Sequence, residues 1–196
     1  MRIVLIPVFV FLILEPWPAW LGDPTWAIWF KPWVAAGVFA LLAVTDGVDG
    51  YLARSRNEIT TLGKFLDPLA DKILVTAALL ALVELGTLPA WIALVIISRE
   101  FLVSGLRMVA SAEGQVIAAS WFGKIKTVTQ IIAVLLFIIK DSPTIIEMGD
   151  SAAHSANIVA WIVMAVALVL TLLSLADYFL KSSTVLGMPL NGKKSD

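Results

Sequence analysis

The sequence contains no cysteine, and its low net charge also excludes a class of protein. Without cysteine the chain can form no disulfide, no thiolate metal site and no cysteine nucleophile. The formal net charge is −1, far from the strong positive charge of a typical nucleic-acid binder, so we expect no nucleic-acid partner. No internal repeat, Ser/Gly linker or low-complexity run divides the 196 residues, which predicts a single domain over residues 1–196.

Apolar residues, in contrast, are abundant: they make up 60% of the sequence, against about 45–50% in soluble domains. A helix needs roughly 20 mostly apolar residues to cross a bilayer, and only helices or closed barrels satisfy their backbone polar groups in lipid. We therefore predict an all-α, polytopic membrane protein, a bundle of six transmembrane helices joined by short connections. The predicted spans are Arg2–Trp20, Trp29–Gly50, Gly63–Val83, Leu88–Val109, Lys124–Ile139 and Asn157–Leu175.

The basic residues are distributed unevenly between the two sides of this predicted bundle. If the N-terminus is cytosolic, all 14 Lys and Arg residues except Lys31 and Lys140 lie on the cytosolic side. Lys and Arg are enriched in cytosolic loops. The sequence therefore predicts a multi-pass protein of the cell inner or plasma membrane, with both termini in the cytosol.

Four aspartates fall inside the second and third predicted spans, where each mid-membrane carboxylate costs about 2.5–3.5 kcal/mol. Asp46 and Asp49 are three residues apart, and Asp67 and Asp71 are four apart, so each pair lies on one helix face. If the two faces meet, they form an all-oxygen site that suits Mg²⁺, Mn²⁺ or Ca²⁺. The alternative is that these aspartates are solvated loop charges.

Small residues share the faces of these aspartates. Gly50 and Ala53 accompany the first pair, and Gly63 and Ala70 accompany the second. They leave room for a bulky ligand beside the carboxylates. The alternative is that they allow the helices to pack closely.

Two arginines fall inside the fourth predicted span. Arg99 and Arg107 are eight residues apart and lie on one ridge of a helix, and Lys124 and Lys126 begin the next span. Guanidinium groups bind phosphate oxygens in bidentate fashion, so these four residues predict a phosphate site. The alternative is that Arg99 pairs with Glu100 or another carboxylate and that the lysines only mark the cytosolic side.

The aspartates belong to a longer pattern with fixed gaps. The run Asp46-Gly47-Val48-Asp49-Gly50-Tyr51-Leu52-Ala53-Arg54, followed by Gly63, Asp67 and Asp71, resembles the signature of the CDP-alcohol phosphatidyltransferase family. Every fixed position of that signature is matched. Three further segments look like those of the family's phosphatidylglycerophosphate synthase branch: Arg99–Arg107, Val116–Ser120 and Gly123–Thr127.

This resemblance implies a metal-dependent transferase whose lipid substrate is CDP-diacylglycerol. It implies that Asp46, Asp49, Asp67 and Asp71 border one or two divalent cations, Mg²⁺ or Mn²⁺, and that Asp71 is the candidate base for the acceptor hydroxyl. It also implies that CDP-diacylglycerol contacts Asp49, Gly50, Ala53, Arg54 and Gly63.

The branch implies that the acceptor is sn-glycerol 3-phosphate, with its phosphate on Arg99, Arg107, Lys124 and Lys126. Attack on the phosphorus next to diacylglycerol would then give phosphatidylglycerophosphate and CMP, in phospholipid biosynthesis. The site would lie in a polar cavity open to the cytosol, surrounded by membrane lipids. The alternatives are another acceptor (inositol phosphate, serine or phosphatidylglycerol) and a cation-coupled transporter. The oligomeric state stays open, with a homodimer one option.

Overall fold

The computed structural model describes the backbone of residues 2–14, 24–56, 61–112 and 121–185, and the side chains of 5–14, 28–45, 72–110, 121, 123 and 125–180. Within these ranges all regular structure is helical and no strand occurs, which confirms the predicted all-α class. The helices, in order, are α1 (Arg2–Leu14), α2 (Pro24–Arg56), α3 (Thr61–Glu84), α4 (Ala90–Ala112), α5 (Trp121–Ile139), α6 (Pro143–Glu147) and α7 (Asp150–Val185).

The six long helices follow the predicted spans in order, but their bounds differ. Helix α7 begins at Asp150 and runs to Val185, beyond the predicted Asn157–Leu175 at both ends, and the short α6 was not predicted. The apolar-run rule counts residues that tolerate lipid, whereas helical hydrogen bonding continues into polar flanks. Residues 15–20, predicted to end the first span, lie outside the described residues.

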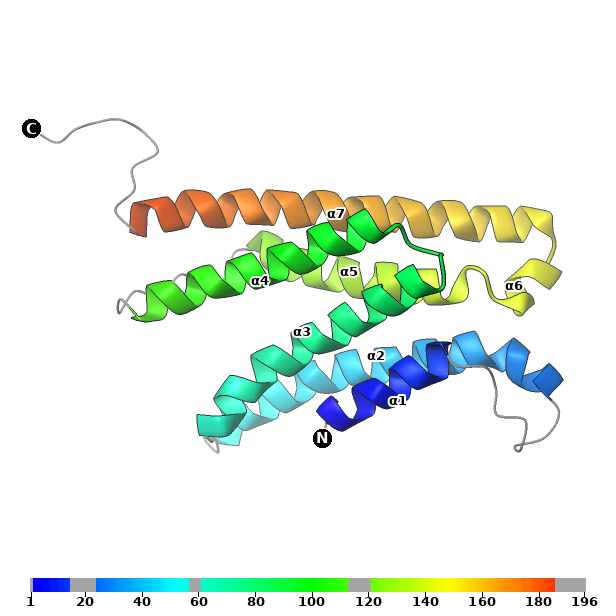
Figure 1. The fold of residues 1–196 in the computed structure, drawn as a ribbon, viewed down its shortest axis with the longest axis horizontal. Coiled ribbons are helices and arrows are strands. Elements are labelled where there is room, and N and C mark those ends of the chain that lie inside the picture. The colour runs from blue at the N-terminus through cyan, green and yellow to red at the C-terminus, as the bar shows by residue number, and fades with distance from the viewer. Residues whose placement is uncertain (1, 15–23, 57–60, 113–120, 186–196) are drawn as a thin grey trace, which may run out of the picture.

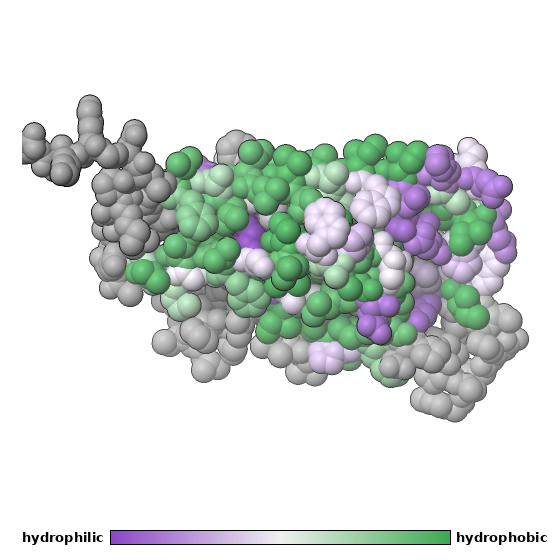
Figure 2. All heavy atoms as spheres, turned by 45° about the horizontal axis from the view of Figure 1, so that its top comes forward, coloured by the Kyte–Doolittle hydropathy of each residue, from purple (hydrophilic) through white to green (hydrophobic). Residues whose placement is uncertain are grey.

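Two described helices are long and apolar enough to cross a membrane. The stretches concerned are Ile28–Thr45 in α2 and Asp150–Leu180 in α7, while Leu5–Leu14 and Ile125–Ile139 are shorter apolar helices. Large apolar side chains also lie on the outside, and Figure 2 shows them covering most of one face, with hydrophilic residues gathered at one end. Soluble monomers rarely expose contiguous apolar areas of this kind, so the fold is consistent with a membrane protein.

The core is built from all six long helices. Phe9 of α1 packs on Phe39 of α2 with ring centroids 5.5 Å apart. Phe137 of α5 meets Trp161 of α7 edge-on, with centroids 5.1 Å apart. These aromatic pairs therefore hold α1 against α2 and α5 against α7.

The connection from α3 to α4 is a tight turn that reverses the chain. Gly86 has φ of +70°, a conformation that costs glycine little and other residues more. Its N–H donates to Val83 O at 2.9 Å, and the N–H of Thr87 donates to Leu82 O at 3.1 Å, the hydrogen-bond pair of a Schellman C-cap. The turn therefore ends α3 sharply and sends α4 back beside it.

This reversal, repeated along the chain, gathers particular helix ends together (Figure 1). The C-terminal ends of α2, α4 and α7 lie at one end of the bundle with the N-terminal ends of α3 and α5. We call this the motif end, because α2 and α3 carry the aspartate motif there. The opposite end, with the α3–α4 turn and α6, is the far end.

Candidate functional site

Two adjacent helices carry the aspartate motif at the motif end. The C-terminal part of α2 holds Asp46, Asp49, Gly50, Ala53 and Arg54, and the N-terminal part of α3 holds Gly63, Asp67 and Asp71. Helices α2 and α3 contact each other. The side chains of all these residues lie outside the described ones, so their roles in metal and nucleotide binding stay predictions.

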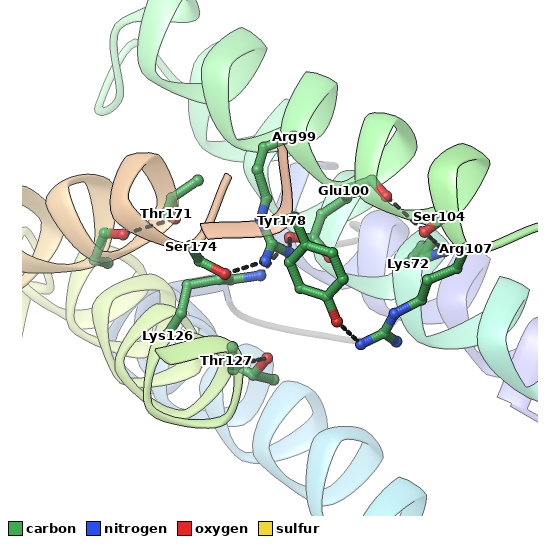
Figure 3. Close-up of polar contacts among 12 residues, drawn as sticks. Lys72, Arg99, Glu100, Ser104, Arg107, Lys126, Thr127, Thr171, Ser174 and Tyr178 are labelled. Atoms are coloured by element: carbon green, nitrogen blue, oxygen red, sulfur yellow. Dashed lines mark hydrogen bonds and ion pairs between the residues drawn. The ribbon is translucent and has the colours of Figure 1, made fainter. Parts of the chain in front are cut away.

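The described part of the site is a basic cluster on α3, α4 and α5, which we define as Lys72, Arg99, Arg107 and Lys126 (Figure 3). Arg99 is 5% exposed and Lys126 is 2% exposed, so two of these cations are buried. Burying a charge is costly unless it is paired or hydrogen-bonded. The partners of these residues therefore decide what the cluster can do.

Arg99 is held from two directions. Its Nη1 donates to Glu100 Oε1 at 3.0 Å, and its Nη2 donates to Ser174 Oγ on α7. Its guanidinium carbon lies 5.9 Å from the centroid of the Tyr178 ring, within the range of a cation–π contact. Its Nε is buried and has no hydrogen-bond partner among the described residues. The structure thus contains the Arg99–Glu100 ion pair that the sequence left as an alternative.

Arg107 shares Tyr178 with Arg99. Its Nη2 donates to the Tyr178 hydroxyl, and its guanidinium carbon lies 5.1 Å from the centroid of that ring. Figure 3 shows Tyr178 between the two arginines. Arg107 is exposed, whereas Tyr178 is 1% exposed, so a fixed tyrosine orients an arginine that an incoming ligand can reach.

Lys126 and Lys72 complete the cluster from α5 and α3. Lys126 Nζ pairs with Glu100 Oε1, and Lys72 Nζ donates to Ser104 Oγ. Ser104 in turn donates to the backbone oxygen of Glu100 at 2.6 Å. A small cavity of about 20 Å³ lies here, lined by Lys72, Val75, Glu100, Lys126, Thr127 and Gln130. The side chain of Lys124 lies outside the described ones, so its phosphate contact stays a prediction.

Sequence reasoning missed the contribution of α7. Thr171, Ser174 and Tyr178 are three and four residues apart, and all are buried. Polar residues at this spacing form one helix face, and within an otherwise apolar run such a face points into the bundle. That spacing was the available signal. It indicates a polar face but not its partners, because Arg99 and Arg107 are 75 and 71 residues away in sequence.

A larger cavity of about 460 Å³ lies at the far end, between α1, α2, α5 and the α3–α4 turn. Its lining is mostly apolar, with Lys31, Thr87 and Asp141 as the polar members. Displacement chemistry at phosphorus needs several charged groups that converge on one point. The basic cluster provides such a convergence, and this cavity does not.

The basic cluster is suited to an anionic group. Its cations come from three helices, and a fourth helix, α7, holds the two arginines in place. Cations fixed before a ligand arrives bind phosphate without a further cost of ordering. Within their helices, Arg107 (towards the C-terminal end of α4) and Lys126 (near the N-terminal end of α5) lie towards the motif end, whereas Arg99 and Lys72 lie near mid-helix. The cluster therefore extends from the middle of the bundle towards the end where α2 and α3 carry the aspartates.

Comparison with known proteins finds relatives that are named as phosphatidyltransferases. A family model described as CDP-alcohol phosphatidyltransferase matches residues 1–173. The CDP-diacylglycerol–glycerol-3-phosphate 3-phosphatidyltransferase of Bacillus subtilis (strain 168) is 48% identical over 146 residues, which cover 72% of this chain and 74% of the relative. The protein of the same name from Escherichia coli (strain K12) is 40% identical over 139 residues, covering 67% and 69%.

A third relative matches a slightly larger share of the chain. The probable phosphatidylglycerophosphate synthase of Mycobacterium tuberculosis (strain ATCC 25618 / H37Rv) is 38% identical over 154 residues, covering 79% of this chain and 68% of the relative. The family model extends past α5 into α7, where Thr171 opens the polar face that meets the arginines. With the complete aspartate signature and a family match over most of its length, this chain belongs to the CDP-alcohol phosphatidyltransferase family.

Proposed function

We propose that this protein transfers the phosphatidyl group from CDP-diacylglycerol to sn-glycerol 3-phosphate, giving phosphatidylglycerophosphate and CMP. The observation that carries the proposal is the position of the basic cluster, which extends from the middle of the bundle towards the end where α2 and α3 carry the aspartates. A lipid pyrophosphate and a phosphorylated acceptor need two such anion-binding regions side by side. Relatives at 40–48% identity carry the name of this activity.

The donor set of α2 and α3 fits a hard divalent cation. Asp46, Asp49, Asp67 and Asp71 offer carboxylate oxygens, which Mg²⁺ and Mn²⁺ prefer over nitrogen or sulfur ligands. In this proposal the four residues hold two such ions. The ions, when bound, supply positive charge that neutralises the pyrophosphate of CDP-diacylglycerol and the departing CMP.

The remaining motif residues serve the nucleotide. Gly50, Ala53 and Gly63 have little or no side chain, so the cytidine and its phosphates can approach the helix backbone. Arg54 neutralises a phosphate or orients a carboxylate. Asp49 borders both the metals and the nucleotide.

The transfer itself is a displacement at the phosphorus bonded to diacylglycerol. Asp71 takes the proton of the acceptor hydroxyl, whose oxygen forms a new bond to this phosphorus. The bond from phosphorus to the bridging oxygen of the pyrophosphate breaks, and that oxygen leaves with CMP. The basic cluster, with Lys124, binds the phosphate of the acceptor and holds its hydroxyl near the reacting phosphorus.

The proposal also places the protein in the membrane. Each of the six spans predicted from the sequence is taken to cross the bilayer, with both termini and the motif end on the cytosolic side. The uneven distribution of Lys and Arg supports this orientation. It gives the lipid substrate access from the bilayer and the water-soluble acceptor access from the cytosol.

An acceptor panel tests the proposal. Purified protein in lipid or detergent is mixed with CDP-diacylglycerol, Mg²⁺ and one acceptor at a time, and CMP release is measured. We expect release with glycerol 3-phosphate and none above the level of an Asp67→Asn control with inositol phosphate, serine or phosphatidylglycerol. Preference for one of those acceptors would reassign the acceptor on the same scaffold. No release with any acceptor would contradict the proposed transferase.

A further inference from the structure

Glu100 is a carboxylate inside the basic cluster, and the chemistry proposed above leaves it without a role. It lies on α4 next to Arg99 and one turn before Ser104. Its Oε1 accepts from Arg99 Nη1 at 3.0 Å and from Lys126 Nζ. One oxygen atom thus joins a cation of α4 to a cation of α5 (Figure 3).

Arg99, Glu100 and Lys126 form a triad of charged side chains that depend on one another because they are largely buried. The side chains of Arg99 and Lys126 are 6% and 3% exposed, and that of Glu100 is 19% exposed. Buried cations need a partner charge, and breaking such a pair by removing one member costs far more than breaking a surface pair. Glu100 therefore fixes where Arg99 and Lys126 can place their remaining N–H groups.

The two arginines of the cluster differ in what they can offer a ligand. Arg99 has Nη1 on Glu100 and Nη2 on Ser174, so both ends of its fork are occupied within the protein. Arg107 is exposed, and only its Nη2 is engaged in a hydrogen bond with a described residue, Tyr178. A bidentate contact with phosphate needs two N–H groups pointing the same way, which Arg107 can supply with less rearrangement.

We propose that Glu100 is a positioning residue for the acceptor site, acting through Arg99 and Lys126. It holds these two cations as a rigid, partly neutralised wall of the site, while Arg107 makes the direct bidentate contact with the acceptor's phosphate. This inference rests on the proposed function, because it assigns Glu100 to the binding of a phosphorylated acceptor. Preorganised charges of this kind act on the substrate that they face and not on the other one.

The test compares Glu100→Gln with the wild-type protein in the CMP-release assay, at varied concentrations of each substrate. The glutamine keeps the size and one acceptor oxygen but loses the charge that holds Lys126 and Arg99. We expect the KM for glycerol 3-phosphate to rise at least about tenfold, because Arg99 and Lys126 are no longer held in place. A change of about tenfold is what the loss of one hydrogen bond between charged groups typically causes. The KM for CDP-diacylglycerol should stay within about twofold. Glu147→Gln on α6, an exposed glutamate at the far end, is the matched control and should change neither value.

A purely structural role would give a different pattern. If Glu100→Gln raises both KM values together, or changes neither, the inference is wrong. Thermal unfolding without substrates accompanies the kinetics, since a positioning role changes the acceptor KM in protein that remains folded at the assay temperature. If Glu100→Gln yields no folded protein, Glu100→Asp decides instead. It keeps the charge but shortens the side chain, so an unchanged acceptor KM would overturn the inference and a selective rise would support it.

A double-mutant cycle tests the route through Lys126. If Glu100 acts by holding Lys126, then Glu100→Gln should raise the acceptor KM by a smaller factor in a Lys126→Met background than in the wild type. Equal factors in both backgrounds would overturn that route. The wild type separates this inference from the proposed function. If wild-type protein releases no CMP with glycerol 3-phosphate, the proposed function fails; if it does and the variants show no acceptor-selective effect, only the role of Glu100 fails.

Discussion

The two ends of the bundle both carry paired charges, but the pairs are made differently. At the far end Lys140 pairs with Asp141, the next residue, and stacks 5.3 Å from the centroid of the Phe137 ring. Towards the motif end Arg99 also pairs with the next residue, Glu100, but Glu100 pairs in addition with Lys126 of α5. The two arginines there also donate hydrogen bonds to Ser174 and Tyr178 of α7, 75 and 71 residues away in sequence. The far-end pair needs only neighbouring residues, whereas the motif-end network forms only when α4, α5 and α7 are in register.

This difference indicates that the contacts towards the motif end hold helices relative to one another, whereas the far-end pair does not. A pair between adjacent residues with a half-exposed member, such as Asp141 at 53% side-chain exposure, contributes little to stability and fixes no helix relative to another. A buried network between helices is costly to desolvate, and such networks are found where specificity or catalysis requires them. The following experiments compare how much each end of the bundle contributes to activity.

The largest effect is expected at the aspartates of the motif end. Asp46→Asn and Asp67→Asn should each remove most of the CMP-release activity. A neutral amide binds a divalent cation more weakly than a carboxylate does, and the cations are needed to neutralise the pyrophosphate. Both variants should still insert and fold. Exhaustive chelation of wild-type protein should have the same effect, reversed by Mg²⁺ or Mn²⁺. Full activity after chelation would contradict the metal site.

The next effect distinguishes a base from a metal ligand. Asp71→Asn should lower kcat by at least about 100-fold, the lower bound for a general base, with little change in the Mg²⁺ concentration for half-maximal rate. Asp49→Asn should instead raise that concentration. Titration of the rate with Mg²⁺ for both variants measures the difference. The same metal dependence in both would make Asp71 chiefly a ligand.

A smaller and more selective effect is expected at Arg107. Arg107→Ala should raise the KM for glycerol 3-phosphate by about 10- to 100-fold, as expected for a hydrogen bond between charged groups, and leave the KM for CDP-diacylglycerol near its wild-type value. Arg107→Lys should restore only part of the loss, since lysine has no bidentate fork. If both KM values rise together, the acceptor's phosphate binds elsewhere.

The smallest effect compares the two ends directly. Tyr178→Phe keeps the ring beneath both arginines but removes the hydroxyl that orients Arg107, so the acceptor KM should rise about two- to tenfold, the loss of one hydrogen bond. Lys140→Met at the far end removes a cation that also stacks on an aromatic ring, and should change neither KM. Equal effects of the two substitutions would show that the two ends do not differ in function as proposed.

The sequence predicted the order of the helices because apolar length is a direct physical requirement of the bilayer. The helix ends were predicted less well. Asp150 begins α7 although it is charged, since it lies in the first turn, where a carboxylate is favourable beside the N-terminal N–H groups. A rule that counts apolar residues excludes such a residue, and α7 was therefore predicted too short.

The aspartate motif was recognisable because its spacing lies within two helices. The partners of the arginines were not, because they depend on which face of α7 turns inward. Ser174 and Tyr178 become partners of Arg99 and Arg107 only after α4 and α7 pack together. Glu100, adjacent to Arg99, could be named from sequence as an alternative partner, but its second bond, to Lys126, required the position of α5.

The uninterrupted length of α7 has a consequence for how this chain can tolerate insertions and deletions. Ser174 and Tyr178 lie on one continuous helix that begins at Asp150. One residue inserted or deleted between Asp150 and Thr171 would turn the rest of the helix by about 100° relative to the part already packed against α5. Both arginine contacts would then be lost in a single event, although no residue that touches an arginine had been replaced. The middle of α7 is therefore intolerant of any change in length, whichever residue is inserted or removed.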